Sequence, residues 1–100
     1  MIDTKDEAML TELQRETFDY FLKEYNEVTG LVADKTQPGS PASIAVTGMS
    51  IPVYITGIEK KFISRDEGAG RILRTLQFIH GSDQSGAIDA TGYKGFYYHF

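Results

Sequence analysis

Between residues 42 and 58 the chain reads ASIAVTGMSIPVYITGI, seventeen residues without a charge, ten of them apolar. On a helix these apolar side chains point in every direction. A helix of that kind is buried in a large fold or spans a membrane, and this stretch is too short and too rich in hydroxyls to cross a bilayer of about 30 Å. We therefore predict a buried helix, kinked at Pro52. Two buried strands are the competing prediction, because many of the residues are β-branched.

Start and stop signals place this helix between two amphipathic ones. Ser40 and Pro41 predict its N-cap and its first turn. Residues 4–26 form the clearest helix, with Gly30 as a stop signal and with most large apolar side chains on one half of the circumference: Leu10, Leu13, Phe18, Phe21, Leu22 and Tyr25. The capping box from Ser64 to Glu67 starts a third helix with an apolar arc at Ala69, Ile72, Leu73, Leu76 and Ile79.

The predicted order is an amphipathic helix, a helix that is apolar all round, and a second amphipathic helix. This order is typical of layered helical barrels, in which the inner helices are covered on nearly all sides. A free domain of 100 residues has too few helices to cover a helix that is apolar all round. We therefore predict an all-α fold with about three helices, forming part of a larger structure. Residues 81–92 are predicted to form a loop, and residues 93–100, rich in aromatic rings, an extended segment.

Composition excludes several classes of function. The net charge is −4, and the excess lies in residues 3–27, where eight acids and three bases give −5; residues 28–100 hold six acids and seven bases, which give +1. No basic face is concentrated enough to predict nucleic-acid binding. With no Cys, and with His80 and His99 far from any acidic cluster, we predict no metal site and no cofactor. Residues 1–7 are acidic, so no secretion signal is predicted within the chain and the compartment stays unknown.

Four blocks of sequence resemble the glucoamylase-like (glycoamylase) family of bacterial glycoside hydrolases, which includes endo-β-1,2-glucanases. They occur in the order and spacing of that family and begin near its first helix. The last block, with its run of aromatic residues, is the strongest match. The four blocks are LQRETFDYF (residues 13–21), TGLVADK (29–35), SPASIA (40–45) and GYKGFYYHF (92–100).

This resemblance implies an (α/α)6 barrel several times longer than this chain, acting on glucans, with a characterised branch that cleaves β-1,2-glucan with inversion. We therefore expect residues 1–100 to be the N-terminal part of a single glucoamylase-like catalytic domain, forming an incomplete barrel. The family's acidic active-site residues are expected downstream of residue 100, so no carboxylate here receives a catalytic role by transfer. Family members are often periplasmic or secreted, whereas no signal peptide is found here.

The candidate substrate-binding residues lie in two of the matched blocks. Asp34 is in the loop that leads to the buried helix. The alternative to a substrate-binding role is a local one, because an Asp in a loop more often binds its own backbone amides. The aromatic end offers flat rings and polar tips suited to sugars. The alternative interpretation is an extended segment that packs in the core, with Phe96, Tyr98 and Phe100 pointing inward. From this end we take Tyr93, Lys94, Tyr97, Tyr98 and His99 as candidates. The acidic pairs Asp6-Glu7 and Asp66-Glu67 are expected to stabilise helix N-termini instead.

Two functions follow from these observations. In the first, the chain is the N-terminal portion of a glucan-acting glycoside hydrolase, supplying barrel helices and part of the sugar-binding wall, and is inactive alone because inverting hydrolysis needs two paired carboxyl groups. In the second, it is a non-catalytic small helical domain that self-associates or binds carbohydrate. Oligosaccharide or polysaccharide is the expected partner, without nucleic acid or membrane.

Overall fold

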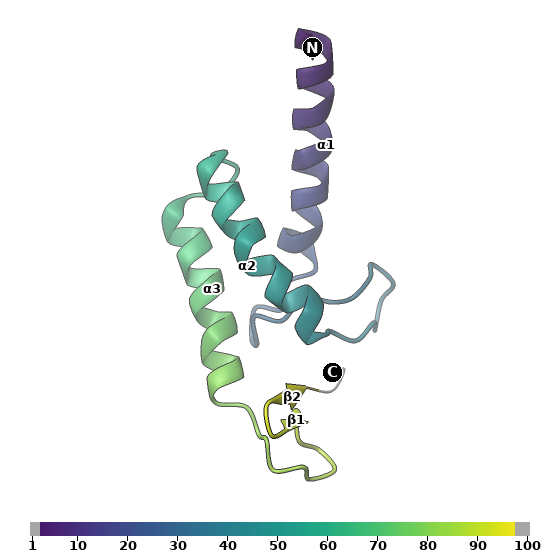
Figure 1. The fold of residues 1–100 in the computed structure, drawn as a ribbon, viewed down its shortest axis with the longest axis vertical. Helices are drawn as coiled ribbons and strands as arrows, with labels where there is room; N and C mark the ends of the chain where they lie inside the picture. The colour runs from purple at the N-terminus through teal and green to yellow at the C-terminus, as the bar shows by residue number, and fades with distance from the viewer. Residues whose placement is uncertain (1–2, 98–100) are drawn as a thin grey trace.

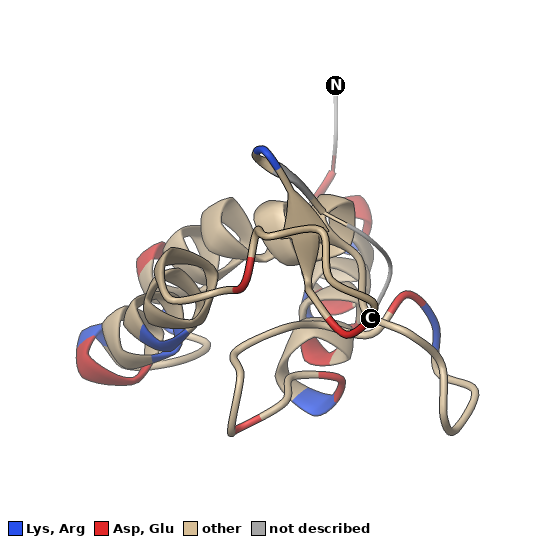
Figure 2. Ribbon diagram, turned by 90° about the horizontal axis from the view of Figure 1, so that it is seen from below, with Lys and Arg blue, Asp and Glu red and all other residues tan. Residues whose placement is uncertain are grey.

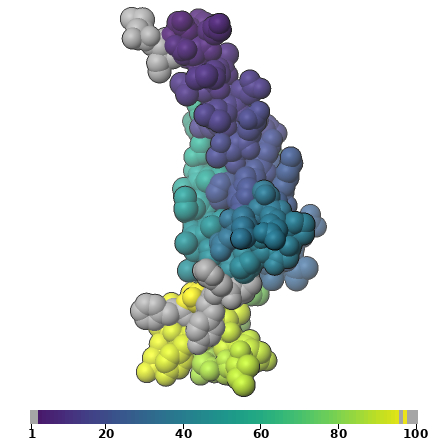
Figure 3. Space-filling view, turned by 90° about the vertical axis from the view of Figure 1, so that its right-hand side faces the viewer, coloured from purple at the N-terminus to yellow at the C-terminus, as the bar shows by residue number. Residues whose placement is uncertain are grey.

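The computed structural model describes residues 3–97, apart from the side chain of Phe96, and shows three helices followed by a small hairpin (Figure 1). The elements are α1 (Thr4–Lys23), α2 (Ile44–Glu59), α3 (Arg65–His80), β1 (Gly92–Tyr93) and β2 (Phe96–Tyr97). The prediction of an all-α chain with three helices is therefore confirmed, and the alternative of two strands in residues 42–58 is wrong. The molecule is elongated, 55 × 28 × 24 Å, because the N-terminal half of α1 projects beyond the other helices (Figure 3).

Each helix begins at a side-chain cap. Asp3 accepts a hydrogen bond from the backbone N–H of Asp6, and Ser64 accepts one from Glu67 at 3.0 Å, as the capping box predicts. The acidic pairs lie in the first turns of α1 and α3, as expected for the helix dipole.

The predicted start of α2 at Ser40 is wrong, because the N-cap is Ser43, whose hydroxyl accepts from the N–H of Val46 at 3.2 Å. Ala42 forms an isolated bridge with Ala33, and the carbonyl of Pro41 accepts from Asp34, so residues 41–42 are extended. The helix then continues through Pro52 to Glu59. At the other end of this loop α1 ends at Lys23 rather than at residue 26, since Tyr25 already pairs with Val32.

The core lies where the three helices meet and contains Phe18, Tyr54 and Ile63. Gly57 lets α1 approach α2 closely, because a Cβ at this position would lie 2.3 Å from Cε2 of Phe18. Phe62, which follows α2, packs against Phe18 with ring centroids 5.3 Å apart. These contacts bury one end of α1 only, which leaves its projecting half exposed.

The sequence predicts that a larger structure covers α2 on nearly all sides, and the described residues cover one side of it. Its buried stripe is largely polar, at Thr47, Ser50, Tyr54 and Gly57. The apolar side chains on other sides remain open, with Met49 exposed to 61% and Ile55 to 56%. On the neighbouring α3, Leu73 and Leu76 are also exposed. The described part of the chain therefore presents an uncovered apolar surface on α2 and α3.

The predicted extended segment after residue 92 folds back on itself instead. Strands β1 and β2 pair antiparallel, with Gly92 opposite Tyr97 and Tyr93 opposite Phe96. Lys94 and Gly95 make the turn with φ of 49° and 88°, the left-handed pair that a two-residue hairpin turn requires. The inward side chains predicted at Tyr98 and Phe100, and that of Phe96, lie outside what the structure describes.

Candidate functional site

The loops that hold the candidate residues meet at one end of the helices. The chain turns from α1 into α2 through residues 24–43, and it leaves α3 through residues 81–97. Both segments lie at the lower end of the molecule in Figure 1, on the side where α1 and α3 end and α2 begins. Figure 2 views this end directly and shows acidic and basic positions spread over several segments.

Buried hydroxyls fix the first loop to the helices behind it. Thr47 of α2 accepts a hydrogen bond from the N–H of Val32 at 3.2 Å, and Thr75 of α3 donates to the carbonyl of Gly30 at 2.7 Å. Both threonines and Val32 have no exposed surface. Because buried backbone groups must find partners, these bonds determine where residues 30–33 lie.

The second loop is organised around Asp83 and Gln84. The carbonyl of Asp83 accepts from the hydroxyl of Thr91 at 3.0 Å, and Oε1 of Gln84 accepts from the N–H of Gly95 at 2.8 Å. The hydroxyl and the backbone N–H of Ser85 lower the pKa of the Asp83 carboxyl. This network presents the hairpin on the same side as the first loop.

A cleft of about 480 Å³ lies between these two loops and the C-terminal part of α3. Residues 23–33 supply much of its wall, Ser40 and Ala42 come from the far side of the first loop, and Thr91 comes from the second loop. Its chemistry is mixed: the lining includes two aromatic rings, one acid and one base, namely Tyr25, Phe78, Glu24 and Lys23.

The ring of Tyr25 is held in place from behind. The guanidinium of Arg71 lies 4.5 Å from its centroid, and Tyr54 meets it edge-on at 6.3 Å. Arg71 is itself anchored, since it donates to the carbonyl of Leu22 at 3.4 Å and pairs with Glu67 at 3.5 Å. Burial raises the pKa of Tyr25, although the charge of Arg71 acts in the opposite direction.

None of the predicted site residues that the structure describes is in the lining of this cleft. Asp34 is half-buried and follows the lining residue Ala33, and its N–H donates to Pro41 at 2.9 Å. Tyr93 is 46% exposed and has the Lys94 ammonium 5.1 Å from its ring centroid.

The hydroxyl of the remaining described candidate, Tyr97, reaches Ser82 and the carbonyl of Ile79, each at 3.4 Å. Tyr98 and His99 lie outside the described residues.

Sequence reasoning missed Tyr25 and Phe78 as possible ligand contacts. Helical spacing assigned Tyr25 to the apolar face of the first helix, and it gave no reason to single out Phe78. Asn26 is a residue type typical of turns and could have placed Tyr25 next to a loop, since its side chain accepts from the N–H groups of Val28 and Thr29.

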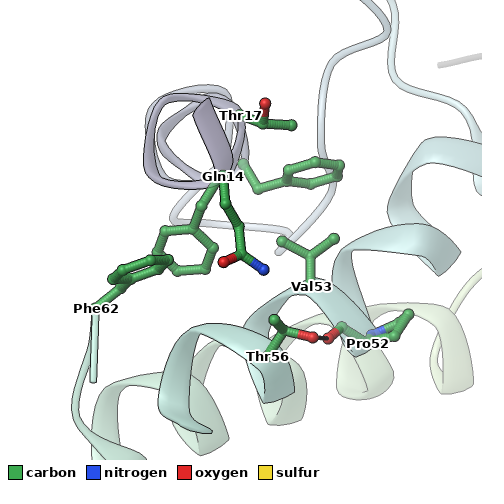
Figure 4. A pocket seen from close by; sticks show the side chains of 8 residues that line it. Gln14, Thr17, Pro52, Val53, Thr56 and Phe62 are labelled. Carbon is green, nitrogen blue, oxygen red and sulfur yellow. Dashed lines mark hydrogen bonds between the residues drawn. The ribbon is translucent and has the colours of Figure 1, made fainter. Parts of the chain in front are cut away.

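A second cavity of about 320 Å³ lies between α1 and α2 (Figure 4). Its lining carries no ionisable group and is dominated by aromatic and aliphatic side chains, among them Phe18, Phe21, Val53 and Phe62. Gln14 points into it, and Thr17 and Thr56 donate to backbone carbonyls of their own helices. This groove therefore offers little polar chemistry to a ligand.

Residues 3–97 hold no group of three or more His, Asp or Glu side chains that could bind a metal ion. Over the same residues, no helix is both long enough and apolar enough to cross a membrane.

The three helices and the two loops at their end are similar to a segment of larger known proteins. The chain is 32% identical over 81 residues to an exo-β-1,2-glucooligosaccharide sophorohydrolase (non-reducing end) of Parabacteroides distasonis. The match covers 79% of this chain and 11% of that protein. No family model matches the chain.

Two solved structures have the same arrangement of elements. A protein of Bacteroides uniformis provisionally assigned as a glucoamylase superposes with a TM-score of 0.72 at 30% identity, covering 79% of this chain and 19% of its own. The endo-β-1,2-glucanase of Chitinophaga pinensis, solved with sophorotriose and glucose, superposes with a TM-score of 0.69 at 20% identity, covering 78% and 21%.

The resemblance to the glucoamylase-like family of glycoside hydrolases is thus confirmed, and this chain corresponds to a segment of such proteins. It spans 11% of the curated relative and about a fifth of each solved chain.

Proposed function

We propose that this chain is the N-terminal portion of a glycoside hydrolase that acts on glucan, and that its loop end forms part of the wall that binds the sugar. In this proposal residues 1–100 belong to a single glucoamylase-like catalytic domain, with β-1,2-linked glucan as the substrate. The helices hold the two loops, and the loops contact the saccharide.

One observation carries the proposal: the segments that hold Asp34 and Tyr93 border the same cleft, although nearly sixty residues of chain separate them. Sugars combine flat C–H faces with many hydroxyls, so they need rings and polar groups in one place. The rings and polar groups in the lining of the cleft meet that need, and the exposed Tyr93 follows the lining residue Thr91 by two positions. The names of the similar proteins, a sophorohydrolase and an endo-β-1,2-glucanase, support the same substrate class.

The chain by itself is expected to be inactive. An inverting hydrolase needs an acid and a base about 6.5–9.5 Å apart. Among the described residues that line the cleft, Glu24 is the single carboxylate. Release of reducing sugar from β-1,2-glucan by the purified chain would therefore contradict this part of the proposal.

Native gel electrophoresis with β-1,2-glucan in the gel tests binding. We expect the glucan, but not dextran, to retard the chain. Tyr93→Ala should weaken the retardation, while Met49→Ala, which alters an exposed side chain of α2, should leave it unchanged. Equal mobility with and without β-1,2-glucan would refute the proposed function.

The second candidate function is self-association, and the uncovered apolar surface on α2 and α3 favours it. Light scattering of the purified chain at increasing concentration should then show a mass that rises above 11.2 kDa. Ile55→Ser should reduce that rise. A constant monomer mass would rule out this candidate and leave the saccharide-binding one untouched.

A further inference from the structure

The cleft between the two loops holds a pair of aromatic rings that come from different elements. Tyr25 follows the end of α1, and Phe78 lies in the last turn of α3. Both side chains are half-buried, so each contributes to the wall without filling the space. The volume of about 480 Å³ is within the range of small-ligand sites, roughly 300–1,000 Å³.

The Tyr25 ring is ordered before any ligand arrives. Arg71 lies against it at 4.5 Å, and the edge contact with Tyr54 fixes its tilt. A ring that is already fixed loses little conformational entropy on binding. It can therefore serve as a platform for the flat face of a ligand.

The polar groups of the lining suit an uncharged ligand with many hydroxyls. Lys23 and Glu24 contribute one charge of each sign, which disfavours an anion such as a phosphate. The hydroxyls of Ser40 and Thr91 donate to the backbone carbonyls of Gln37 and Asp83, at 2.6 and 3.0 Å. Their oxygen lone pairs remain able to accept hydrogen bonds from sugar hydroxyls.

We infer that this cleft is a binding subsite for a glucosyl residue, with Tyr25 and Phe78 contacting its apolar faces and with Lys23 and Glu24 binding its hydroxyls. The inference rests on the proposed function and adds the residues that hold one sugar unit. It assigns the contact to a cleft whose lining includes none of the residues predicted from sequence.

Titration of the isotope-labelled 100-residue chain with sophorose, followed by amide and aromatic NMR shifts, tests the inference. The linear polyol mannitol serves as the control ligand, because it has hydroxyls but no ring face. We expect saturable shifts at Tyr25, Phe78 and Thr91 with sophorose alone. Phe78→Leu keeps apolar bulk but removes the aromatic face, and should weaken binding roughly three- to tenfold.

Two further variants separate stacking from damage to the fold. Tyr25→Phe keeps the ring, so it should retain most of the affinity. Phe62→Leu makes the same substitution at another half-buried ring, in the groove between α1 and α2, and should leave binding unchanged. The helix content of each variant is checked by circular dichroism.

The outcomes distinguish this inference from the proposed function. Shifts could be confined to Asp34 and the hairpin, with unchanged affinity in Phe78→Leu. That result would overturn the subsite but would agree with the proposed sugar-binding wall. Absence of saturable shifts at any described residue would overturn both. Equal weakening by Phe78→Leu and Phe62→Leu would also overturn the subsite, because it would trace the loss to general destabilisation.

Discussion

Replacing Gly30 with alanine should loosen the contact that fixes the first loop against α3. Gly30 is buried and has φ of +79°, a conformation that L-residues rarely adopt. An added Cβ would lie 2.5 Å from the backbone nitrogen of Thr75 and 2.7 Å from its Cα. These atoms belong to the helix backbone and cannot rotate away, so the loop or the helix must move.

The cost has two parts. A left-handed conformation penalises a residue with a Cβ by about 1–2 kcal/mol. Overpacking of a tight contact adds about 1–3 kcal/mol, so Gly30→Ala should lower the free energy of unfolding by roughly 2–5 kcal/mol. Small domains are stable by about 5–15 kcal/mol, which makes this a large share of the total.

Gly39 in the same loop provides the matched control. It has the same φ of +79° but nothing lies within 4 Å of its would-be Cβ. Gly39→Ala should therefore carry the conformational penalty alone, about 1–2 kcal/mol. Urea unfolding followed by far-ultraviolet circular dichroism measures both variants, and equal losses of stability would refute the role assigned to the Gly30–Thr75 contact.

Two further predictions concern a helix cap and a buried ring. Ser64→Ala removes the hydroxyl that accepts from Glu67 and should cost about 1 kcal/mol; an unchanged urea midpoint would show that the cap contributes nothing. Burial raises the pKa of Tyr54, so the folded state holds its phenolic proton more tightly than the unfolded state does. Stability from this group is complete below about pH 10 and falls as the pH rises toward the raised value, and Tyr54→Phe should show a shallower alkaline loss than the parent; identical profiles would contradict this assignment.

Local sequence signals predicted the helices well but not all of their ends. The cap at Ser64 is followed by its Glu67 partner, so the start of α3 could be read directly. The start of α2 could not, because Ser40 and Ser43 are equally good caps. Pairing of Ala33 with Ala42 decides between them, and that contact joins residues on opposite sides of a loop.

Hydrophobic patterning did not predict which side of α2 is buried within this chain, because the apolar residues point in every direction. It marks apolar residues as core, yet Thr47 is fully buried and Met49 is largely exposed. The hydroxyl of Thr47 is needed to bind the N–H of Val32, a requirement that only the folded loop creates. Apolar content therefore predicted burial in general but not its direction.

The sequence indicated Asp34 and Tyr93, and the structure places their loops at one end of the helices, while contact of these residues with a sugar stays a prediction. Tyr25 was missed because helical periodicity assigned it to a core face. Its role in the cleft depends on Arg71 behind it, which is 46 residues away in sequence. Contacts over such distances leave no local signal.

Hydroxyl-radical footprinting of the chain with and without β-1,2-glucan tests the sugar-binding wall most directly, because it reports which side chains the polymer covers. We predict reduced oxidation of Tyr93 and Tyr25 at the loop end. Oxidation of Met49 and Met9, which are exposed on α2 and on the projecting half of α1, should stay the same. Unchanged oxidation of Tyr93 and Tyr25, or protection of Met49 instead, would contradict the account.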